Sequence, residues 1–289
     1  MSSLASTDAV QPLSEGQKAA LLKLLSDEDA SVYRTVRAKI ISYGEPATQW
    51  LRPHTLSNEP VLRRRAMEIV NYLSRQVADN HFLGFCLRQG EDLDLEEGAW
   101  LLARTQYPDI NVQAYQAMLD SYVGDLKERI DFGSGVESIL GSINHYLFKE
   151  LGFYGNETNY NDPDNSYLNR VLDRRTGIPI SLCLVYLFLG RRLRLPIVGI
   201  GMPGHFLLRF QSTTGEIFID AFNQGKLLTK ADCIKYLIHT SGFQEAYLAP
   251  VSPRRILLRM CSNLHQIYAQ LEVTEEIARL QRYIIALAK

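Results

Sequence analysis

The chain has 289 residues, of which 46% are hydrophobic and 22% are charged, so it can form one large domain or two to three small ones with ample cores. Its formal net charge of -1 provides no basic field for phosphate groups, which argues against a nucleic-acid partner. The longest apolar run, around Ile178–Leu189, is broken by Ser181 and is too short to span a bilayer, so we expect no membrane segment.

The cysteines and histidines show no spacing typical of a metal site. The four cysteines are scattered and include no CxxC pair; they are Cys86, Cys183, Cys233 and Cys261. This pattern argues against structural zinc and against a disulfide framework, and it fits a reducing compartment. The N-terminus lacks the positive and apolar regions of a signal peptide. We therefore predict a cytoplasmic protein without metal or cofactor.

The first 132 residues have the composition and periodicity of a helical region. Residues 1–14 are polar, and we expect them to be frayed. In the following region, 15–132, apolar residues recur at helical spacing, for example Val32, Val36 and Ile40. The stretch 21–51 resembles a HEAT-type repeat, with a helix, an acidic turn, a second helix and a glycine break. One such unit cannot bury its apolar face alone, so neighbouring helices must stack on it.

The sequence pattern changes after the glycine-rich segment 131–135, which we interpret as a domain boundary. Helical periodicity and short β-branched runs alternate from here to residue 245. The expected elements are helices at 136–152, 166–173, 181–192 and 230–240, and strands at 196–201, 206–210 and 216–220. We predict a hairpin-like turn at 212–215 between the last two strands. The region 133–245 is therefore predicted to be an α+β domain.

The C-terminal segment 246–289 has a simpler pattern. Two apolar helical stretches, at 253–271 and 274–288, are separated by a short break. This arrangement predicts a helical hairpin.

Two blocks within the α+β region resemble a known family. They read NYNDPDNSYLNRVLDRRTGIPISLCLVYLFLGRRLRLPIVGIGMPGHFLLRF, at 159–210, and IFIDAFNQG, at 217–225. Both are similar to the SirB1-type transglutaminase-like family, and the likeness covers about residues 135–235. It implies a papain-like core with helical regions on both sides. Members of that family often carry TPR-like helices after the core, so the resemblance implies that the C-terminal hairpin is one TPR-like pair.

The same resemblance assigns roles to two residues. In catalytic transglutaminase-like domains, a cysteine at a helix N-terminus is the nucleophile, because the helix end lowers its pKa. A histidine on the following strand acts as base, and an aspartate on the next strand orients it. His205 and Asp220 match these two residues and are fifteen positions apart. We expect them to lie side by side and to share a hydrogen bond.

The nucleophile position departs from the family pattern. Gly177 matches the glycine of the pattern Gly-x-Cys, so Pro179 stands where the cysteine would be. Proline suits the first turn of a helix but has no nucleophilic atom. Cys183 follows one turn later and is predicted to be a core residue, with a displaced nucleophile as the alternative. Ser181 is a second candidate, although serine in a first helical turn usually bonds to the backbone.

A polar cluster lies just before this helix. It consists of Tyr160, Asp162, Asn165 and Ser166. The cluster fits a capped loop packed over the sheet, and it equally fits one wall of a groove leading to His205. Both interpretations stay open at this point.

These patterns favour a non-catalytic transglutaminase-like protein that acts as an interaction or regulatory scaffold. A protein or peptide partner is expected, because the concave faces of helical repeats commonly bind proteins. The alternative is a hydrolase or acyltransferase of the protease, amidase or transglutaminase type. It would use Cys183 or Ser181 together with the remnant pair His205 and Asp220. A third hypothesis is small-ligand binding in the cleft left by the missing nucleophile.

Overall fold

A computed structural model describes residues 13–88, 90–212 and 215–289. The predicted frayed segment 1–14 thus lies almost entirely outside the described residues, as do two of the four residues of the predicted turn at 212–215. The chain divides into two compact units. One unit comprises the residues up to Asn80 together with Thr105–Asp109, and the other comprises His81–Arg104 and Ile110–Lys289.

The first unit is built from helices whose ends carry local caps. Its elements are α1 (Glu15–Leu25), α2 (Ala30–Ile41), α3 (Glu45–Leu51), the 3-10 turn η1 (Arg52–Leu56) and the part of α4 (Pro60–Cys86) up to Asn80. Ser14 accepts a hydrogen bond from the Gln17 amide, and the Gln17 side chain accepts one from the Ser14 amide. This reciprocal pair satisfies two N–H groups that the first helical turn leaves unpaired.

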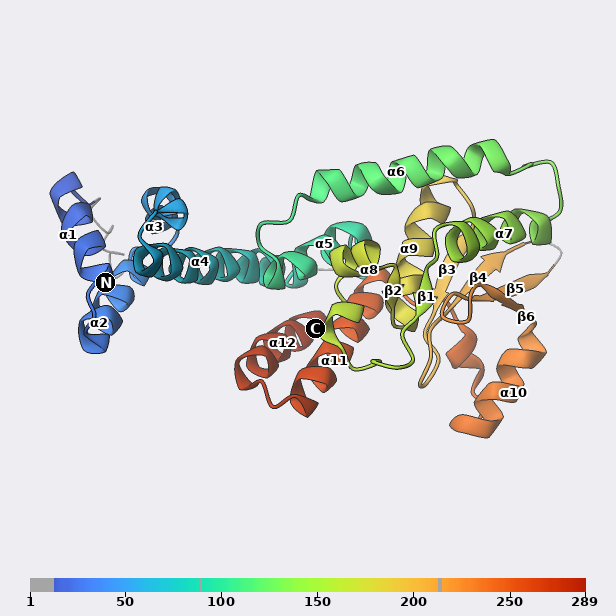
Figure 1. The fold of residues 1–289 in the computed structure, drawn as a ribbon. Helices are drawn as coiled ribbons and strands as arrows, with labels where there is room; N and C mark the ends of the chain where they lie inside the picture. The colour runs from blue at the N-terminus through green and yellow to red at the C-terminus, as the bar shows by residue number, and fades with distance from the viewer. Residues whose placement is uncertain (1–12, 89, 213–214) are drawn as a thin grey trace, which may run out of the picture. The chain divides into compact units, whose positions relative to one another are not determined.

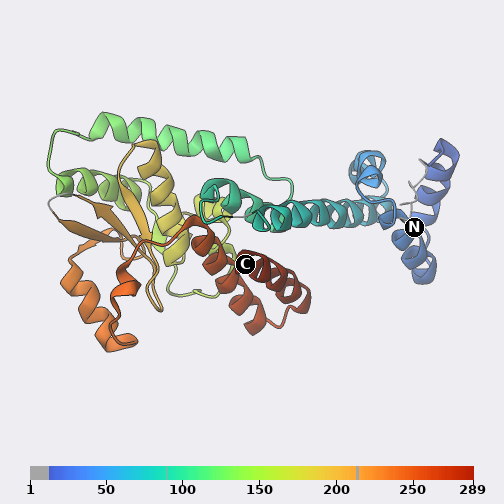
Figure 2. The same cartoon turned by 180° about the vertical axis from the view of Figure 1, so that it is seen from behind.

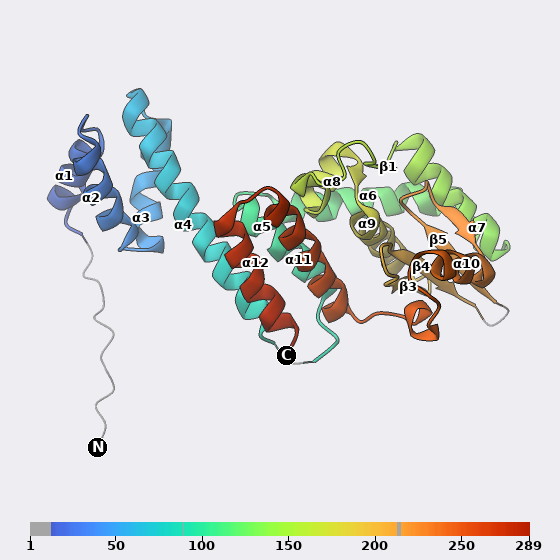
Figure 3. The same cartoon turned by 90° about the horizontal axis from the view of Figure 1, so that it is seen from below.

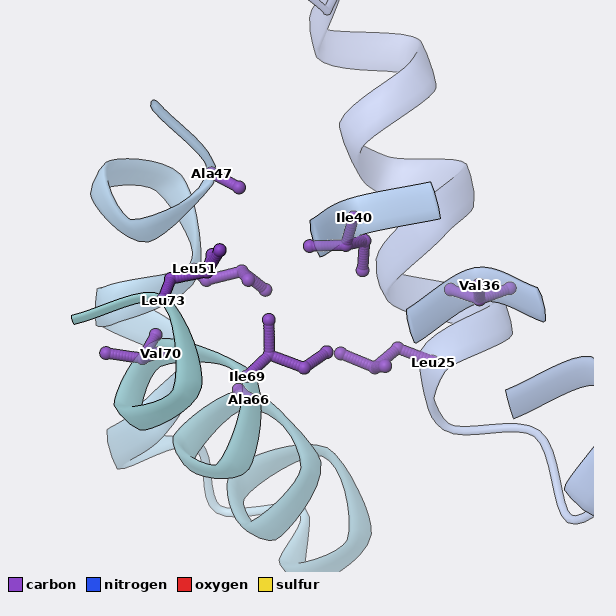
Figure 4. Close-up of a cluster of buried hydrophobic side chains, with 9 residues drawn as sticks. All are labelled: Leu25, Val36, Ile40, Ala47, Leu51, Ala66, Ile69, Val70 and Leu73. Atoms are coloured by element: carbon purple, nitrogen blue, oxygen red, sulfur yellow. The ribbon is translucent and has the colours of Figure 1, made fainter. Parts of the chain in front are cut away.

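The core of the first unit is a cluster of nine buried apolar side chains, shown in Figure 4. Its members come from all four helices: Leu25, Val36, Ile40, Ala47, Leu51, Ala66, Ile69, Val70 and Leu73. Each helix of this unit is short or amphipathic, so none of them can bury its apolar face without the others.

The second unit combines a four-stranded antiparallel sheet with helices (Figure 1). Its strands, in spatial order, are β3 (Ile197–Ile200), β4 (Leu207–Gln211), β5 (Glu216–Asp220) and β6 (Lys226–Leu228). The strand β6 was not predicted from the sequence. A two-residue parallel pair, β1 (Tyr154–Gly155) and β2 (Thr176–Gly177), lies outside this sheet.

Helices cover both faces of the four-stranded sheet. On one face, Leu207 and Phe218 cluster with Cys233 and Leu237 of α10 (Lys230–Thr240). Neighbouring strand residues point to the opposite face, where α9 (Pro179–Arg192) contacts β3 and β4. The helix α6 (Val112–Arg129) packs on α9 in turn (Figures 1 and 2). This layering explains why α9 is almost entirely apolar, since it is enclosed by the sheet and by other helices.

The remaining helices of the second unit precede and follow this layered core. They are α5 (Leu95–Gln106, of which the part up to Arg104 belongs here), α7 (Val136–Asn144) with the π-helical turn η2 (His145–Glu150), the 3-10 turn η3 (Pro163–Asn165), α8 (Leu168–Arg174), the 3-10 turn η4 (Glu245–Leu248), α11 (Pro253–Gln270) and α12 (Thr274–Leu287). The helical hairpin α11–α12 agrees with the pattern read from the sequence to within one residue at its ends.

The C-terminal hairpin packs against the first residues of the second unit (Figure 3). A Cβ added to Gly98 of α5 would lie 2.6 Å from Leu257 of α11, so the two helices pack closely at this point. The rings of Phe82 and Tyr283 meet edge to face, with centroids 4.7 Å apart. The buried Arg254 donates to the carbonyl of Cys86 at 3.4 Å and to that of Leu287 at 3.1 Å. One arginine therefore caps the C-terminal ends of α4 and α12.

The core of the first unit gives a stability prediction. Replacing the fully buried Ile69 with alanine removes three carbon atoms from the centre of the cluster. We expect Ile69→Ala to lower the free energy of unfolding by about 2–5 kcal/mol in urea denaturation followed by circular dichroism. Met67→Ala is the matched control on the same helix, because the Met67 side chain is exposed. It should change stability by less than about 0.5 kcal/mol; equal losses in the two variants would contradict this account of the core.

Candidate functional site

The two polar residues singled out by the resemblance meet at one end of the sheet. Asp220 is the last residue of β5, and His205 precedes the neighbouring strand β4. Nε2 of His205 lies 2.9 Å from Oδ2 of Asp220. Both side chains are largely shielded, with relative exposures of 15% and 7%. The antiparallel register, which pairs Leu208 with Ile219, brings the two residues together.

Asp220 is held by further hydrogen bonds. The Asn223 side-chain amide donates to Oδ2 at 2.8 Å, and the Asn223 backbone N–H donates to Oδ1 at 3.2 Å. Burial alone would raise the pKa of the Asp220 carboxyl, but the hydrogen bonds and charge of His205, together with the bonds from Asn223, outweigh it. The net effect is a pKa below the usual value of an aspartate. Asp220 is therefore an ionised acceptor at neutral pH.

The His205 ring is fixed by its surroundings as well as by Asp220. Nη2 of Arg259, on α11, donates to the His205 carbonyl oxygen at 2.7 Å. The ring lies near the rings of Phe222 and Tyr236, at centroid distances of 6.3 Å and 6.1 Å. With Nε2 facing Asp220, the other ring nitrogen, Nδ1, remains for contacts away from the sheet.

His205 borders two cavities. The larger, about 540 Å³, lies between the segment Gly201–Phe206, the N-terminal end of α9 and one face of α11. The second, about 410 Å³, lies between the sheet and α10 and is bordered by Lys226, Lys235 and His239. The candidate site is thus a His–Asp pair at which two cavities meet. The start of α9 faces the larger of these two cavities.

The start of α9 places Pro179 at the larger cavity. The helix begins at Pro179, two residues before the predicted start, with proline at its first position. Proline has no N–H, and a first-turn N–H has no partner within the helix, so the helix tolerates it here. Ile178, Pro179 and Ile180 all line the cavity, and the side chain of Pro179 carries no nucleophilic atom.

Ser181 lies on the inner side of the same helical turn and is buried. Its hydroxyl accepts a hydrogen bond from the Ile178 N–H at 3.1 Å and lies 2.6 Å from the Asn165 carbonyl, to which it donates. It is not among the residues that line either cavity around His205. Ser181 therefore joins the start of α9 to the preceding loop.

Cys183 is fully buried. Its Sγ donates to the Phe206 carbonyl oxygen at 3.5 Å. Burial, with the negative charge of Asp220 as a further cause, raises the pKa of the Cys183 thiol well above its usual value. The thiol is thus stabilised in its protonated form, and it lines neither cavity around His205.

The four residues predicted as a groove wall occupy different environments. Tyr160 lines the larger cavity, and its ring meets Phe222 edge to face at 6.1 Å. Asp162 pairs with Arg174 at 2.8 Å. Asn165 and Ser166 are buried, and the Asn165 side chain donates to the Asn159 carbonyl at 2.7 Å. Only Tyr160 of this group is a cavity residue; Asn165 supports the loop that carries it.

Sequence reasoning missed the cavity wall formed by α11. Arg259, Asn263, Gln266 and Gln270 all line the larger cavity. Their spacing of four, three and four residues places them on one face of the helix. The row of polar residues on one face of α11 could have indicated a binding surface from the sequence. Its location opposite α9, however, depends on the tertiary fold.

In the described part of the chain, no helix has the length and apolar composition that a membrane span requires. Across residues 13–88, 90–212 and 215–289, no three His, Cys, Asp or Glu side chains are grouped so that they could hold a metal ion.

The chain was compared with known proteins. The family model described as "Transglutaminase-like superfamily" matches residues 113–262. A UPF0162 protein of Xylella fastidiosa is 36% identical over 204 residues, covering 68% of this chain and 73% of that relative. A UPF0162 protein of Pseudomonas aeruginosa is 32% identical over 189 residues, covering 64% of this chain and 68% of the relative.

A third relative is larger. The human protein named F-box only protein 21 is 34% identical over 232 residues, which cover 69% of this chain and 36% of that protein. No solved structure gave a significant match to the chain.

The lowered pKa of Asp220 predicts a pH-dependent contribution to stability. The pKa of Asp220 is lower in the folded chain than in the unfolded chain. Its carboxylate therefore contributes fully to folding stability above about pH 4, and this contribution is lost as the pH falls through the pKa of the folded state. At pH 7 we expect Asp220→Asn to reduce the free energy of unfolding by about 1–3 kcal/mol. The difference from the unsubstituted chain should shrink at pH 3.5, as measured by urea denaturation at both pH values.

The matched control for this prediction is Glu128→Gln, at an exposed position of α6. That variant should follow the unsubstituted chain at both pH values. An Asp220→Asn chain as stable as the unsubstituted one at pH 7 would show that the pair contributes nothing to folding.

Proposed function

The chain belongs to the transglutaminase-like superfamily, and from this premise we propose that it is a non-catalytic member that binds a protein or peptide partner. The observation that carries the proposal is Pro179, which stands at the first position of α9 and borders the cavity beside His205. Catalytic domains of this kind need a thiolate at that helix end, and proline cannot supply one. The finer likeness to SirB1-type proteins is part of the same proposal.

Neither alternative nucleophile has the environment that catalysis requires. A nucleophile must be deprotonated or lie within hydrogen-bond reach of its base. The Cys183 thiol has a pKa well above its usual value and is enclosed, and the Ser181 hydroxyl is engaged with the Ile178 N–H and the Asn165 carbonyl. We therefore assign both residues to the packing and capping of α9.

The His205–Asp220 pair has a structural role in this proposal. It connects the segment before β4 to the end of β5 through a 2.9 Å contact in a shielded place. Removing one partner of such a bond leaves the other polar group buried and unsatisfied, which costs about 1–3 kcal/mol. This cost is a reason for a chain to keep the pair when the nucleophile is absent.

The partner is proposed to be a protein or peptide, bound with the help of the helical regions. We propose a HEAT-like region at 15–132, the transglutaminase-like domain at 133–245 and a TPR-like hairpin at 246–289. Stacked helical repeats offer extended surfaces that bind other chains. The likeness to F-box only protein 21 supports a protein partner. The four cysteines are free and buried, which fits the proposed reducing cytoplasm.

One observation favours the enzymatic alternative, a cysteine- or serine-dependent hydrolase or acyltransferase. The His205 ring is oriented as a general base would be, with Nε2 bound to a carboxylate and Nδ1 free of it. Cys183 lies close by, since its Sγ contacts the carbonyl of the residue after His205. Exposure of this thiol would be required for the reaction.

Thiol labelling separates the two candidates. We expect Cys183 in the native chain to react with iodoacetamide at pH 7 at least about 100-fold more slowly than in guanidinium, because its thiol is enclosed and protonated. Peptide mapping by mass spectrometry measures the modification at each cysteine. His205→Ala should leave this slow rate unchanged. Fast labelling of native Cys183 that disappears in His205→Ala would overturn the non-catalytic assignment.

Restoring a thiol at the family's nucleophile position tests the assignment of Pro179. In Pro179→Cys, the new thiol would lie at a helix N-terminus beside the cavity, where the helix end lowers its pKa. We expect it to react with iodoacetamide at pH 7 at least about tenfold faster than the thiol of Ser262→Cys. Ser262 is the matched control because it lines the same cavity from the middle of α11. Equal rates would show that position 179 is not a nucleophile position.

A further inference from the structure

Arg259 is a cation at the larger cavity that has no carboxylate partner within the described residues. It is half-buried on α11 and lines the cavity beside His205. One of its nitrogens, Nη2, donates to the His205 carbonyl at 2.7 Å, and its Cζ lies 5.6 Å from the Phe206 ring centroid. A guanidinium carries five N–H donors, so most of the donors of Arg259 remain for a ligand.

Three other partly shielded arginines of the second unit are neutralised. Arg192 contacts Glu96 at 2.8 Å, Arg174 contacts Asp162 at 2.8 Å, and Arg209 contacts Glu216 at 2.8 Å. For Arg192, these bonds raise the pKa of the guanidinium. For Arg259, burial lowers the pKa of the guanidinium, because no carboxylate among the described residues offsets the loss of hydration. A shielded charge without a partner is costly, and an incoming anion would remove that cost.

The rest of the cavity wall on the α11 side is uncharged; it includes three side-chain amides together with Ser262 and Ile267. Asn263, Gln266 and Gln270 continue from Arg259 along one helix face. In the described part of the chain their amides make no hydrogen bond to other side chains or backbone, so both donors and acceptors are available. Among the described residues, no aspartate or glutamate lines the cavity. The wall therefore presents one cation followed by a row of amides.

The dimensions of this row fit a short peptide. Gln270 lies eleven positions after Arg259, which corresponds to about 16 Å along the helix axis. An extended chain covers about 3.3 Å per residue, so about four or five residues match this length. Side-chain amides can pair with backbone N–H and C=O groups without regard to the peptide's sequence.

We propose that the larger cavity binds the C-terminal end of a peptide chain, with the terminal carboxylate on Arg259 and the preceding backbone amides along the amide row of α11. A single planar guanidinium matches a carboxylate, whereas a phosphate dianion is usually held by several cationic or N–H donors. The N-terminal end of α9 faces the same cavity and adds its positive dipole end.

This assignment rests on the proposed function in one respect, because it takes the cavity as a place of binding and not of reaction. The non-catalytic assignment and the peptide-binding proposal are contradicted by different results. Cleavage or transfer of a bound peptide would overturn the non-catalytic assignment. Peptide binding that does not depend on the terminal carboxylate would overturn the peptide-binding proposal.

The test uses the full-length chain and two matched probes. One is a mixed-sequence pool of N-acetylated tetrapeptides with a free C-terminal carboxylate, and the other is the same pool with a C-terminal amide. NMR titration follows the Arg259 side chain and the backbone amides of residues 201–206 and 259–270. We expect the acid pool to shift these signals with at least tenfold higher apparent affinity than the amide pool. Mass spectrometry of the recovered acid pool should show unchanged peptides.

Three variants test the site. Arg259→Gln and Gln266→Glu should each weaken binding of the acid pool at least tenfold, the first by removing the cation and the second by adding a negative charge. Gln266 is exposed, so its replacement tests the site without removing a buried contact. Arg255→Gln is the matched control on the same helix, at an exposed position outside the cavity, and should change binding less than twofold.

Several outcomes would overturn the proposal. They are equal binding of the acid and amide pools, no shift at millimolar peptide, unchanged binding in Gln266→Glu, and displacement of the acid pool by equimolar inorganic phosphate. The last outcome would identify a general anion site in place of a peptide site.

Discussion

A short series of hydrogen bonds links the end of β5, the segment between β3 and β4, and α11, and the last two of these border the larger cavity. Asp220 at the end of β5 binds the His205 ring, and the His205 carbonyl accepts a bond from Arg259 on α11. The segment between β3 and β4 is thereby tied on one side to the sheet and on the other to the C-terminal hairpin. Each bond lies in a partly shielded place, so it loses little strength to competition from water.

The beginning of α9 depends on a second set of buried polar contacts. Asn156 donates to Asn165, Asn165 donates to the carbonyls of Asn159 and Tyr160, and Ser181 donates to the carbonyl of Asn165. These bonds fix the loop that carries Tyr160 to the first turn of the helix. A polar network of this kind is stabilising only when its members find partners, and it then specifies one loop geometry. The position of Pro179 at the cavity follows from that geometry.

The contrast between Pro179 and Arg259 has a physical interpretation. Under the proposed function, Pro179 stands where catalytic domains of the superfamily place the reactive atom that uses the histidine as its base. The cavity and the oriented histidine are present, and Arg259 has no carboxylate partner among the described residues. On this proposal, the site can hold a ligand but has no atom that attacks it.

The sequence by itself determined most of the helices, three of the four strands of the main sheet and the pairing of His205 with Asp220. The helices and strands follow from apolar periodicity, which is local. The pairing of the two residues was implied by the family resemblance, and their spacing of fifteen residues across one hairpin agrees with it. From the resemblance, it also predicted that Pro179 stands at the family's nucleophile position. The short strand β6 was missed because three residues carry too little periodicity to distinguish a strand from a loop.

Only the tertiary structure decided which side chains share the cavity. Arg259 and the amides of α11 lie more than fifty residues from His205 in sequence, so no local pattern relates them to it. The tertiary structure likewise separated Tyr160, which lines the cavity, from Asn165 and Ser166, which are buried. Periodicity shows which face of a helix is polar, but the packing of the helix against the rest of the fold decides whether that face meets solvent or a binding site.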